Sequence, residues 1–185
     1  MTEPGLADKL VALHNALDAA AIPHAIGGAI ALGYYADPRA TIDVDINVFV
    51  PVSEHAVVFD AIVGLGVAMP ANVAALERDG QVRTWWGHTA VDLFFQYDAF
   101  HERMRQMARL VPFGDAEIRV LAPEHLVVCK AVFDRTKDWI DIDNVLTATP
   151  DLDVDEVRTW LGHLVGVDDQ RWVRIDEALT RLLGR

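Results

Sequence analysis

The sequence predicts an α/β protein with a C-terminal helical extension, and three observations support this prediction. Helical and strand-like patterns alternate up to about residue 122. Beyond Pro123 only helical patterns follow. The length of 185 residues suits one domain with a proper core, or a compact domain with a small helical extension. We therefore expect an α/β core over residues 1–122 and a helical region over residues 123–185 that packs on this core, since no flexible linker separates them.

The first elements follow from hydrophobic spacing and from prolines and glycines. Apolar residues recur at helical spacing over residues 5–20, and Pro23 stops that helix. A strand at 24–26, a Gly-Gly turn and a helix at 29–36 are expected next. The stretch TIDVDINVFV (41–50) is rich in β-branched and apolar residues, which predicts a buried strand. Ser53 is the expected N-cap of a helix over residues 53–65.

The remaining elements are short strands followed by helices. Strand-like runs lie at residues 81–86, 90–96, 108–112 and 117–121, with a short helix at 98–106. Helical patterns cover residues 124–134, 137–148, 153–164 and 169–183.

Composition and charge exclude several classes of protein. The apolar fraction of 52% and the charged fraction of 24% are typical of a globular, soluble protein. No apolar run reaches membrane-spanning length and the N-terminus has no signal pattern, so we expect a cytoplasmic protein without membrane contact. The net charge of −12 disfavours extensive contact with nucleic-acid phosphates and suits a cationic substrate or a bound divalent metal better.

Cysteine and histidine give no metal-binding signal in the sequence. The single cysteine, Cys129, excludes an intrachain disulfide and a cysteine-based zinc site. The seven histidines show no ligand spacing such as His-x-x-x-His on one helix. We therefore expect the histidines to be structural or surface residues.

Asp43 and Asp45 interrupt the apolar strand over residues 41–50, two positions apart. Side chains alternate along a strand, so both carboxylates point to the same face and repel each other. An isolated Asp-x-Asp is often a solvated strand edge. Asp92 lies in a second apolar strand-like run, AVDLFF, and the three carboxylates would converge if strand 90–96 lay beside strand 41–50. Mg²⁺ prefers hard oxygen ligands, so this arrangement predicts a metal site.

Gly27 and Gly28 end a strand and open a helix. Without Cβ atoms they let a phosphate approach the backbone, and a helix N-terminus offers free N–H groups. The alternative is a tight turn with no ligand. Their position shortly before the Asp-x-Asp strand favours a phosphate cradle near the metal site.

Together these residues resemble the nucleotidyltransferase superfamily related to DNA polymerase β. The pattern is Gly27-Gly28, a helix, a strand carrying Asp43-x-Asp45, and the later carboxylate of Asp92. The stretch RATIDVD (39–45) is similar to the Arg-x-Thr-x-Asp-x-Asp signature of a small bacterial branch that holds AbiEii-type toxins and aminoglycoside or lincosamide nucleotidyltransferases. The resemblance implies a nucleotidyltransferase-like mixed sheet flanked by helices.

The segment at residues 121–146 resembles that branch further. The resemblance implies that Lys130 contacts nucleotide phosphate and that Asp138 helps to organise the site, through Arg135 or Lys137. Read without the resemblance, Lys130 is a plain surface lysine. Arg39 is either a loop charge or a contact to nucleotide phosphate, and we include it among the candidate nucleotide-binding residues. Asp141 and Asp143 are interpreted as a solvated helix face.

The resemblance implies transfer of a nucleoside monophosphate from a nucleoside triphosphate, expected to be ATP, to an acceptor hydroxyl. Asp43 and Asp45 would bind Mg²⁺, and Asp92 would bind a second metal or accept the hydroxyl proton. The expected acceptor is a small molecule, such as an aminoglycoside-like compound. Two alternatives stay open: a toxin-type transferase acting on tRNA or protein, with an antitoxin partner, and a non-catalytic binding module on the same fold.

Overall fold

The computed structural model describes residues 3–184, and the chain divides into two compact units. The first unit comprises the chain up to Ile30 together with Ala40–Leu121. The second comprises Ala31–Arg39 together with the chain from Ala122 onward. Each unit is described in turn.

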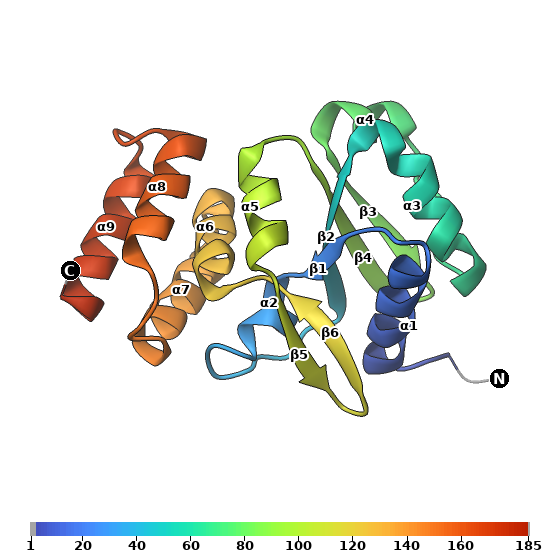
Figure 1. The fold of residues 1–185 in the computed structure, drawn as a ribbon, viewed down its shortest axis with the longest axis horizontal. Coiled ribbons are helices and arrows are strands. Elements are labelled where there is room, and N and C mark those ends of the chain that lie inside the picture. The colour runs from blue at the N-terminus through green and yellow to red at the C-terminus, as the bar shows by residue number, and fades with distance from the viewer. Residues whose placement is uncertain (1–2, 185) are drawn as a thin grey trace. The chain divides into compact units, whose positions relative to one another are not determined.

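The first unit is built on a mixed six-stranded sheet with the order β3-β4-β2-β1-β6-β5 (Figure 1). Strand β2 pairs in parallel with β4, and β1 in parallel with β6, whereas the other neighbours are antiparallel. The strands are β1 (His24–Ile26), β2 (Asp43–Pro51), β3 (Gln81–Trp86), β4 (Thr89–Gln96), β5 (Arg109–Phe113) and β6 (Ala116–Val120). The predicted mixed sheet flanked by helices is therefore confirmed.

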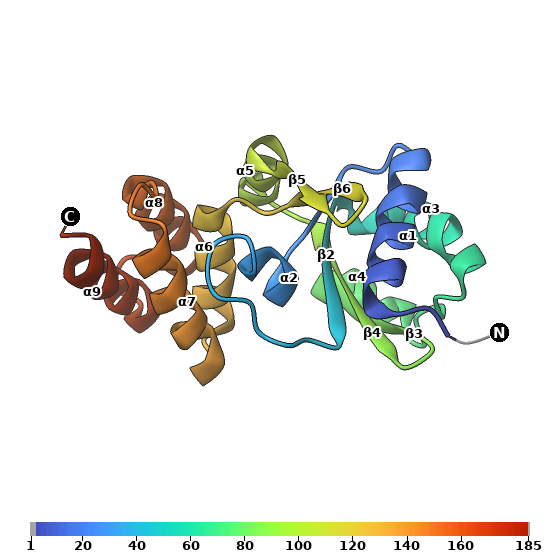
Figure 2. The same ribbon diagram turned by 90° about the horizontal axis from the view of Figure 1, so that it is seen from below.

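Four helices lie wholly within the described part of the first unit: α1 (Leu6–Ala19), α3 (His55–Ile62), α4 (Val73–Asp79) and α5 (Ala99–Met107). Helices α1 and α3 contact each other, and α1 also contacts β2 and β6 (Figures 1 and 2). The core lies under α1, because every second residue of β2 on that face, Val44, Ile46 and Val48, is fully buried. The opposite face of β2 carries the two aspartates.

Two local predictions are wrong, and one helix was not predicted. Helix α4 was not expected, although Asn72 caps its start by accepting from the Ala75 N–H and Gly80 ends it in the left-handed conformation. Ser53 is not a helix cap, because it lies within a 3₁₀ turn (Val52–Glu54) that precedes α3. Helix α2 (Gly28–Leu32) is shorter than the expected helix over residues 29–36.

The second unit is helical. It contains α6 (Pro123–Phe133), α7 (Thr136–Ala148), α8 (Val154–Val165) and α9 (Gln170–Leu183), and α6 contacts each of the other three. Pro123 begins α6 at the first helical position, where its missing N–H costs no hydrogen bond. Buried apolar residues from all four helices form its core: Val127, Ile142, Leu161 and Leu179 are among them. The predicted C-terminal helical extension is confirmed.

Among the helices of residues 3–184, none is both long enough and apolar enough to cross a membrane.

Candidate functional site

Strand β2 presents Asp43 and Asp45 on the face opposite the core. Both are half-buried, while Val44 between them is fully buried, as the alternation of a strand requires. The Thr41 hydroxyl donates to Asp43 Oδ1, which orients that carboxylate. The sequence prediction that the two carboxylates share a face agrees with this geometry.

Strand β4 brings Asp92 beside Asp45. The two strands are parallel and in register, with Asp45 opposite Asp92 and Asp43 opposite Ala90. Residues in register on neighbouring strands point to the same face, so all three carboxylates lie on one face of the sheet. The condition for the three carboxylates to converge, namely that strand 90–96 lies beside strand 41–50, is therefore met.

Arg83 of β3 is a residue of this cluster that sequence reasoning missed. It stands opposite Asp92 in the antiparallel β3–β4 pair. Its Nε lies 2.8 Å from Asp92 Oδ1 and its Nη2 2.6 Å from Oδ2, a two-pronged ion pair. The same Nη2 lies 3.8 Å from Asp43 Oδ2. Hydrogen bonding to Asp92 raises the pKa of Arg83 above its ordinary value, so the guanidinium stays charged.

The sequence alone does not indicate that Arg83 belongs to the cluster. Arginine at the third position of the strand QVRTWW is ordinary for an exposed strand face. The register of the β3–β4 pair places Arg83 opposite Asp92. A shift of this register by one residue would turn the Arg83 side chain to the other face of the sheet.

Gly28 lies directly against Asp45. Its backbone has φ of +57°, a conformation that favours glycine, and a Cβ built there would stand 2.6 Å from Asp45 Cγ. Gly27 also leaves little room, since its Cβ would stand 3.0 Å from Asn47 Nδ2. The Gly27 N–H donates to the backbone carbonyl of Asp45 at 2.9 Å. The glycine turn and the aspartate strand are therefore adjacent, which supports the sequence expectation.

The second unit gathers the other predicted site residues into a separate cluster. The Lys130 ammonium is buried and lies 2.6 Å from Asp141 Oδ2 and 3.9 Å from Asp138 Oδ1. Arg39 Nε lies 3.2 Å from Asp141 Oδ2. The interpretation of Lys130 as a plain surface lysine, and of Asp141 as part of a solvated face, is wrong.

Asp138 has a structural role at the start of α7. It is fully buried, accepts from the backbone N–H of Arg135 at 3.2 Å, and pairs with the Arg135 guanidinium at 2.6 Å. A carboxylate at this position satisfies a free N–H and complements the positive end of the helix dipole. Asp143, by contrast, is exposed and pairs with Arg181, as expected of a solvated face.

Solved structures identify the fold. The solution structure of the antibiotic-resistance factor ANT(2'')-Ia matches 97% of this chain and 100% of its own, with a TM-score of 0.62 and 14% identity. A crystal structure of ANT(2'')-Ia in complex with adenylyl-2''-tobramycin matches 92% of this chain and 97% of its own, with a TM-score of 0.59 and 14% identity. The chain has a nucleotidyltransferase fold. The lincosamide antibiotic adenylyltransferase LnuA, bound to lincomycin, shares the nucleotidyltransferase fold over 77% of this chain and 97% of its own, with a TM-score of 0.56 and 12% identity.

At the level of sequence, no protein-family model and no curated protein matches the chain. The fold that the resemblance implies is thus confirmed by solved structures and not by sequence similarity.

The carboxylate face of this nucleotidyltransferase fold has the donors that Mg²⁺ prefers. Asp43, Asp45 and Asp92 supply hard oxygen ligands, and the Gly28 backbone leaves open the space beside Asp45 that a side chain would fill. Arg83 provides the positive charge that balances these carboxylates in the structure. A cation at this face would therefore compete with the Arg83 guanidinium for Asp92.

Proposed function

We propose that the protein is a Mg²⁺-dependent nucleotidyltransferase that moves a nucleoside monophosphate from a nucleoside triphosphate to a hydroxyl of a small molecule. The observation that carries the proposal is the register of β2 and β4, which puts Asp92 beside Asp45 on a nucleotidyltransferase fold, with Gly28 against Asp45. ATP is the expected triphosphate.

Asp43 and Asp45 would hold Mg²⁺, which when bound neutralises triphosphate charge and orients the reacting phosphate. Asp92 would hold a second ion or accept the proton of the acceptor hydroxyl. Gly27 and Gly28, which have no side chains, would let a phosphate bind close to the backbone. Arg83 would release Asp92 as the cation binds, and its freed guanidinium suits a phosphate or a carboxylate.

Lys130 and Arg39 as phosphate contacts, and Asp138 as an organising residue, remain predictions. Lys130 and Arg39 share the carboxylate of Asp141 in the structure. In a phosphate-binding role each would exchange that carboxylate for a phosphate oxygen. The buried ion pair with Asp141 also accounts for a lysine at position 130 without any ligand.

For the acceptor, we propose a cationic small molecule of the aminoglycoside kind. The net charge of −12 favours a polycationic acceptor over an RNA. Two of the solved structures that share the fold hold adenylyl-2''-tobramycin and lincomycin. A toxin-type reaction on tRNA or protein, with an antitoxin partner, has no specific support from the structure.

The Arg83–Asp92 ion pair favours a second candidate, a non-catalytic module on the same fold. Arg83 contacts both carboxylate oxygens of Asp92 and neutralises the charge that a transferase would need for metal binding or proton transfer. In such a module the arginine would replace the metal permanently. Binding of a triphosphate that requires Mg²⁺ separates the two candidates.

The test compares wild type with Asp45→Asn, and uses Asp60→Asn, an exposed aspartate on α3, as the matched control. Calorimetry measures triphosphate binding with and without Mg²⁺. Release of pyrophosphate is then measured with pooled aminoglycosides, with lincosamides and with tRNA as acceptors.

We expect triphosphate binding only with Mg²⁺, weakened on the order of 100-fold in Asp45→Asn and unchanged in Asp60→Asn. The acceptor that stimulates pyrophosphate release identifies the reaction, and stimulation by tRNA alone would favour the toxin-type alternative. Absence of triphosphate binding in the wild type would contradict the transferase and support the binding module.

A further inference from the structure

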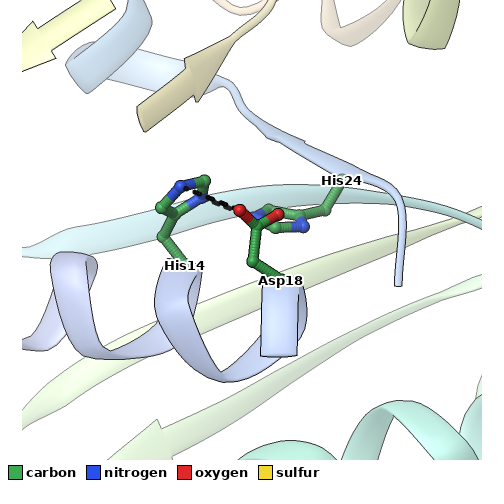
Figure 3. Close-up of side chains that lie close together, drawn as sticks. All are labelled: His14, Asp18 and His24. Atoms are coloured by element: carbon green, nitrogen blue, oxygen red, sulfur yellow. Dashed lines mark hydrogen bonds and ion pairs between the residues drawn. The ribbon is translucent and has the colours of Figure 1, made fainter. Parts of the chain in front are cut away.

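A second group of ligand atoms lies on the opposite side of β1, away from the carboxylate face. His14 and Asp18 are four residues apart on α1, so they share one face of the helix. His24 is the first residue of β1, and the turn at residues 20–22 brings it back against that face (Figure 3). Among residues 3–184, this is the group of three histidine, cysteine or acidic residues whose ligand atoms all lie within 4.8 Å of one another.

The tautomer of His24 follows from its neighbours. His24 Nδ1 lies 2.8 Å from the Ile22 carbonyl oxygen, which can only accept, so Nδ1 carries the proton. Nε2 of His24 then presents a lone pair, and it lies 2.7 Å from His14 Nδ1. A backbone carbonyl that holds one imidazole nitrogen while the other faces a ligand is the usual outer partner of a metal-bound histidine.

The same reasoning leaves an unfavourable contact at His14. In the neutral pair His14 Nδ1 must donate to His24, so His14 Nε2 carries a lone pair. That lone pair faces Asp18 Oδ2 at 3.7 Å, and two acceptors face each other (Figure 3). A cation resolves the contact.

The donors define the class of ion. Two imidazole nitrogens and one carboxylate suit zinc and its neighbours, whereas Mg²⁺ prefers oxygen ligands alone. Ligands of a tetrahedral zinc ion stand about 3.3 Å from one another, given bonds of about 2.0–2.1 Å. Measured from His14 Nε2, the separation of 3.7 Å from Asp18 Oδ2 is close to this value. An imidazole offers an ion only one nitrogen, so His24 Nε2 has to leave His14 Nδ1, from which it lies 2.7 Å, to join His14 Nε2 at the ion. The rearrangement is small, because one ligand atom of each residue already lies within 4.8 Å of the other two. The Asp18 side chain is 55% exposed, so solvent can supply the fourth ligand.

We propose that His14, Asp18 and His24 bind one divalent transition-metal ion of the zinc class, which fastens the end of α1 to β1. The site is independent of the carboxylates of β2 and β4. Because His24 begins β1, which ends one residue before Gly27, the ion would anchor the strand that leads into the glycine turn.

The test uses the full chain after treatment with a chelator. Calorimetry measures Zn²⁺ binding, and the absorption spectrum of Co²⁺ reports tetrahedral coordination. The variants are Asp18→Asn and His24→Gln, and the matched controls are Asp155→Asn and His163→Gln, an exposed aspartate and an exposed histidine on α8. Asp45→Asn is measured as well, because it separates this site from the Mg²⁺ site.

We expect one equivalent of Zn²⁺ to bind wild type, both controls and Asp45→Asn with equal affinity. Asp18→Asn should bind at least about tenfold more weakly, and His24→Gln should lose the site. If His24→Gln does not fold, the imidazole nitrogen resonances of wild-type His14 and His24 decide, since metal binding must shift them. Equal Zn²⁺ affinity in Asp18→Asn and wild type, or unmoved resonances, would overturn the proposal.

Discussion

At the residue scale, the candidate site depends on positions where an added atom or a lost charge has an immediate effect. Gly28 is one, because its positive φ and its contact with Asp45 both require a missing Cβ. Arg83 is another, because it balances Asp92 and approaches Asp43. Each leads to a measurement that separates local strain from function.

Gly28→Ala should abolish triphosphate binding and destabilise the fold by about 1–3 kcal/mol, since it adds backbone strain and a Cβ that meets the Asp45 carboxylate. Gly114→Ala is the matched control, with φ of +59° and no neighbour within 4 Å of its Cβ. Denaturant unfolding and calorimetry measure both variants. Equal stability losses and equal nucleotide binding in the two variants would rule out the proposed role of the Gly28–Asp45 contact.

Arg83→Ala should increase the stabilisation that Mg²⁺ gives to the protein, because three carboxylates lose their positive neighbour and the cation loses a competitor. Thermal unfolding at increasing Mg²⁺ concentration measures the effect. Arg78→Ala, which removes an exposed arginine paired with Asp79, should behave as wild type. The same Mg²⁺ response in Arg83→Ala and wild type would show that Arg83 does not compete with the ion.

At the scale of elements, the end of α1 and the α6–α7 pair are held by specific local interactions. Helix α1 ends with the Ala21 N–H donating to the Asp18 carbonyl and the Ile22 N–H donating to the Leu17 carbonyl. Ala21 stands there with φ of +55°, where glycine is preferred. Helices α6 and α7 are joined by the buried Lys130–Asp141 ion pair.

Ala21→Gly should stabilise the protein by about 0.5–1 kcal/mol, because glycine adopts the left-handed conformation without strain. Ala20→Gly is the comparison, since Ala20 has φ of −84° and gains nothing from glycine. Chemical denaturation measures both free energies of unfolding. A loss of stability in Ala21→Gly equal to that in Ala20→Gly would contradict the prediction.

Lys130→Ala should destabilise the protein by about 3 kcal/mol, because it leaves the buried Asp141 carboxylate with Arg39 as its remaining cation in the structure. Asp141→Asn introduced into Lys130→Ala should restore part of the loss, since it removes the excess buried charge. Unfolding by denaturant measures the free energy of unfolding of wild type, of both single variants and of the double variant. Additive losses in the double variant would mean that the two residues are not coupled.

At the scale of the whole molecule, stability should depend on pH through buried histidines. Desolvation lowers the pKa of His14, His24 and His101 below the ordinary value of 6.5. The neighbouring charges are Asp18 and Arg119 for the first two, and Asp98 for His101, whose carboxylate partly opposes the effect of burial.

Below pH 6.5 the unfolded chain binds protons that the folded chain does not, so stability should fall as the pH drops from about 6.5 through the folded pKa values. Denaturant unfolding between pH 7.5 and pH 5 measures the trend. His24→Gln should flatten it, whereas the exposed His163→Gln should not. Constant stability over this range would contradict the prediction.

Local patterns determined most of the fold of this protein. Hydrophobic periodicity, Pro23 and Pro123 placed helices and strands within a few residues of their observed bounds, because these signals act between sequence neighbours. The alternation of β2 placed Asp43 and Asp45 on one face for the same reason. The short helix α4 was missed because seven residues carry too little periodicity, although Asn72 and Gly80 marked its ends.

Tertiary structure alone decided which side chains from distant segments meet. Sequence could suggest that Asp92 joins the aspartates, but strand register places it beside Asp45 and puts Arg83 opposite it. The burial of Lys130 with Asp141, and the meeting of His14 with His24 across a turn, follow from packing and not from spacing. Periodicity specifies the face of an element, whereas partners across a sheet or between helices depend on how whole elements pair, and that pairing is set by the summed burial of many residues.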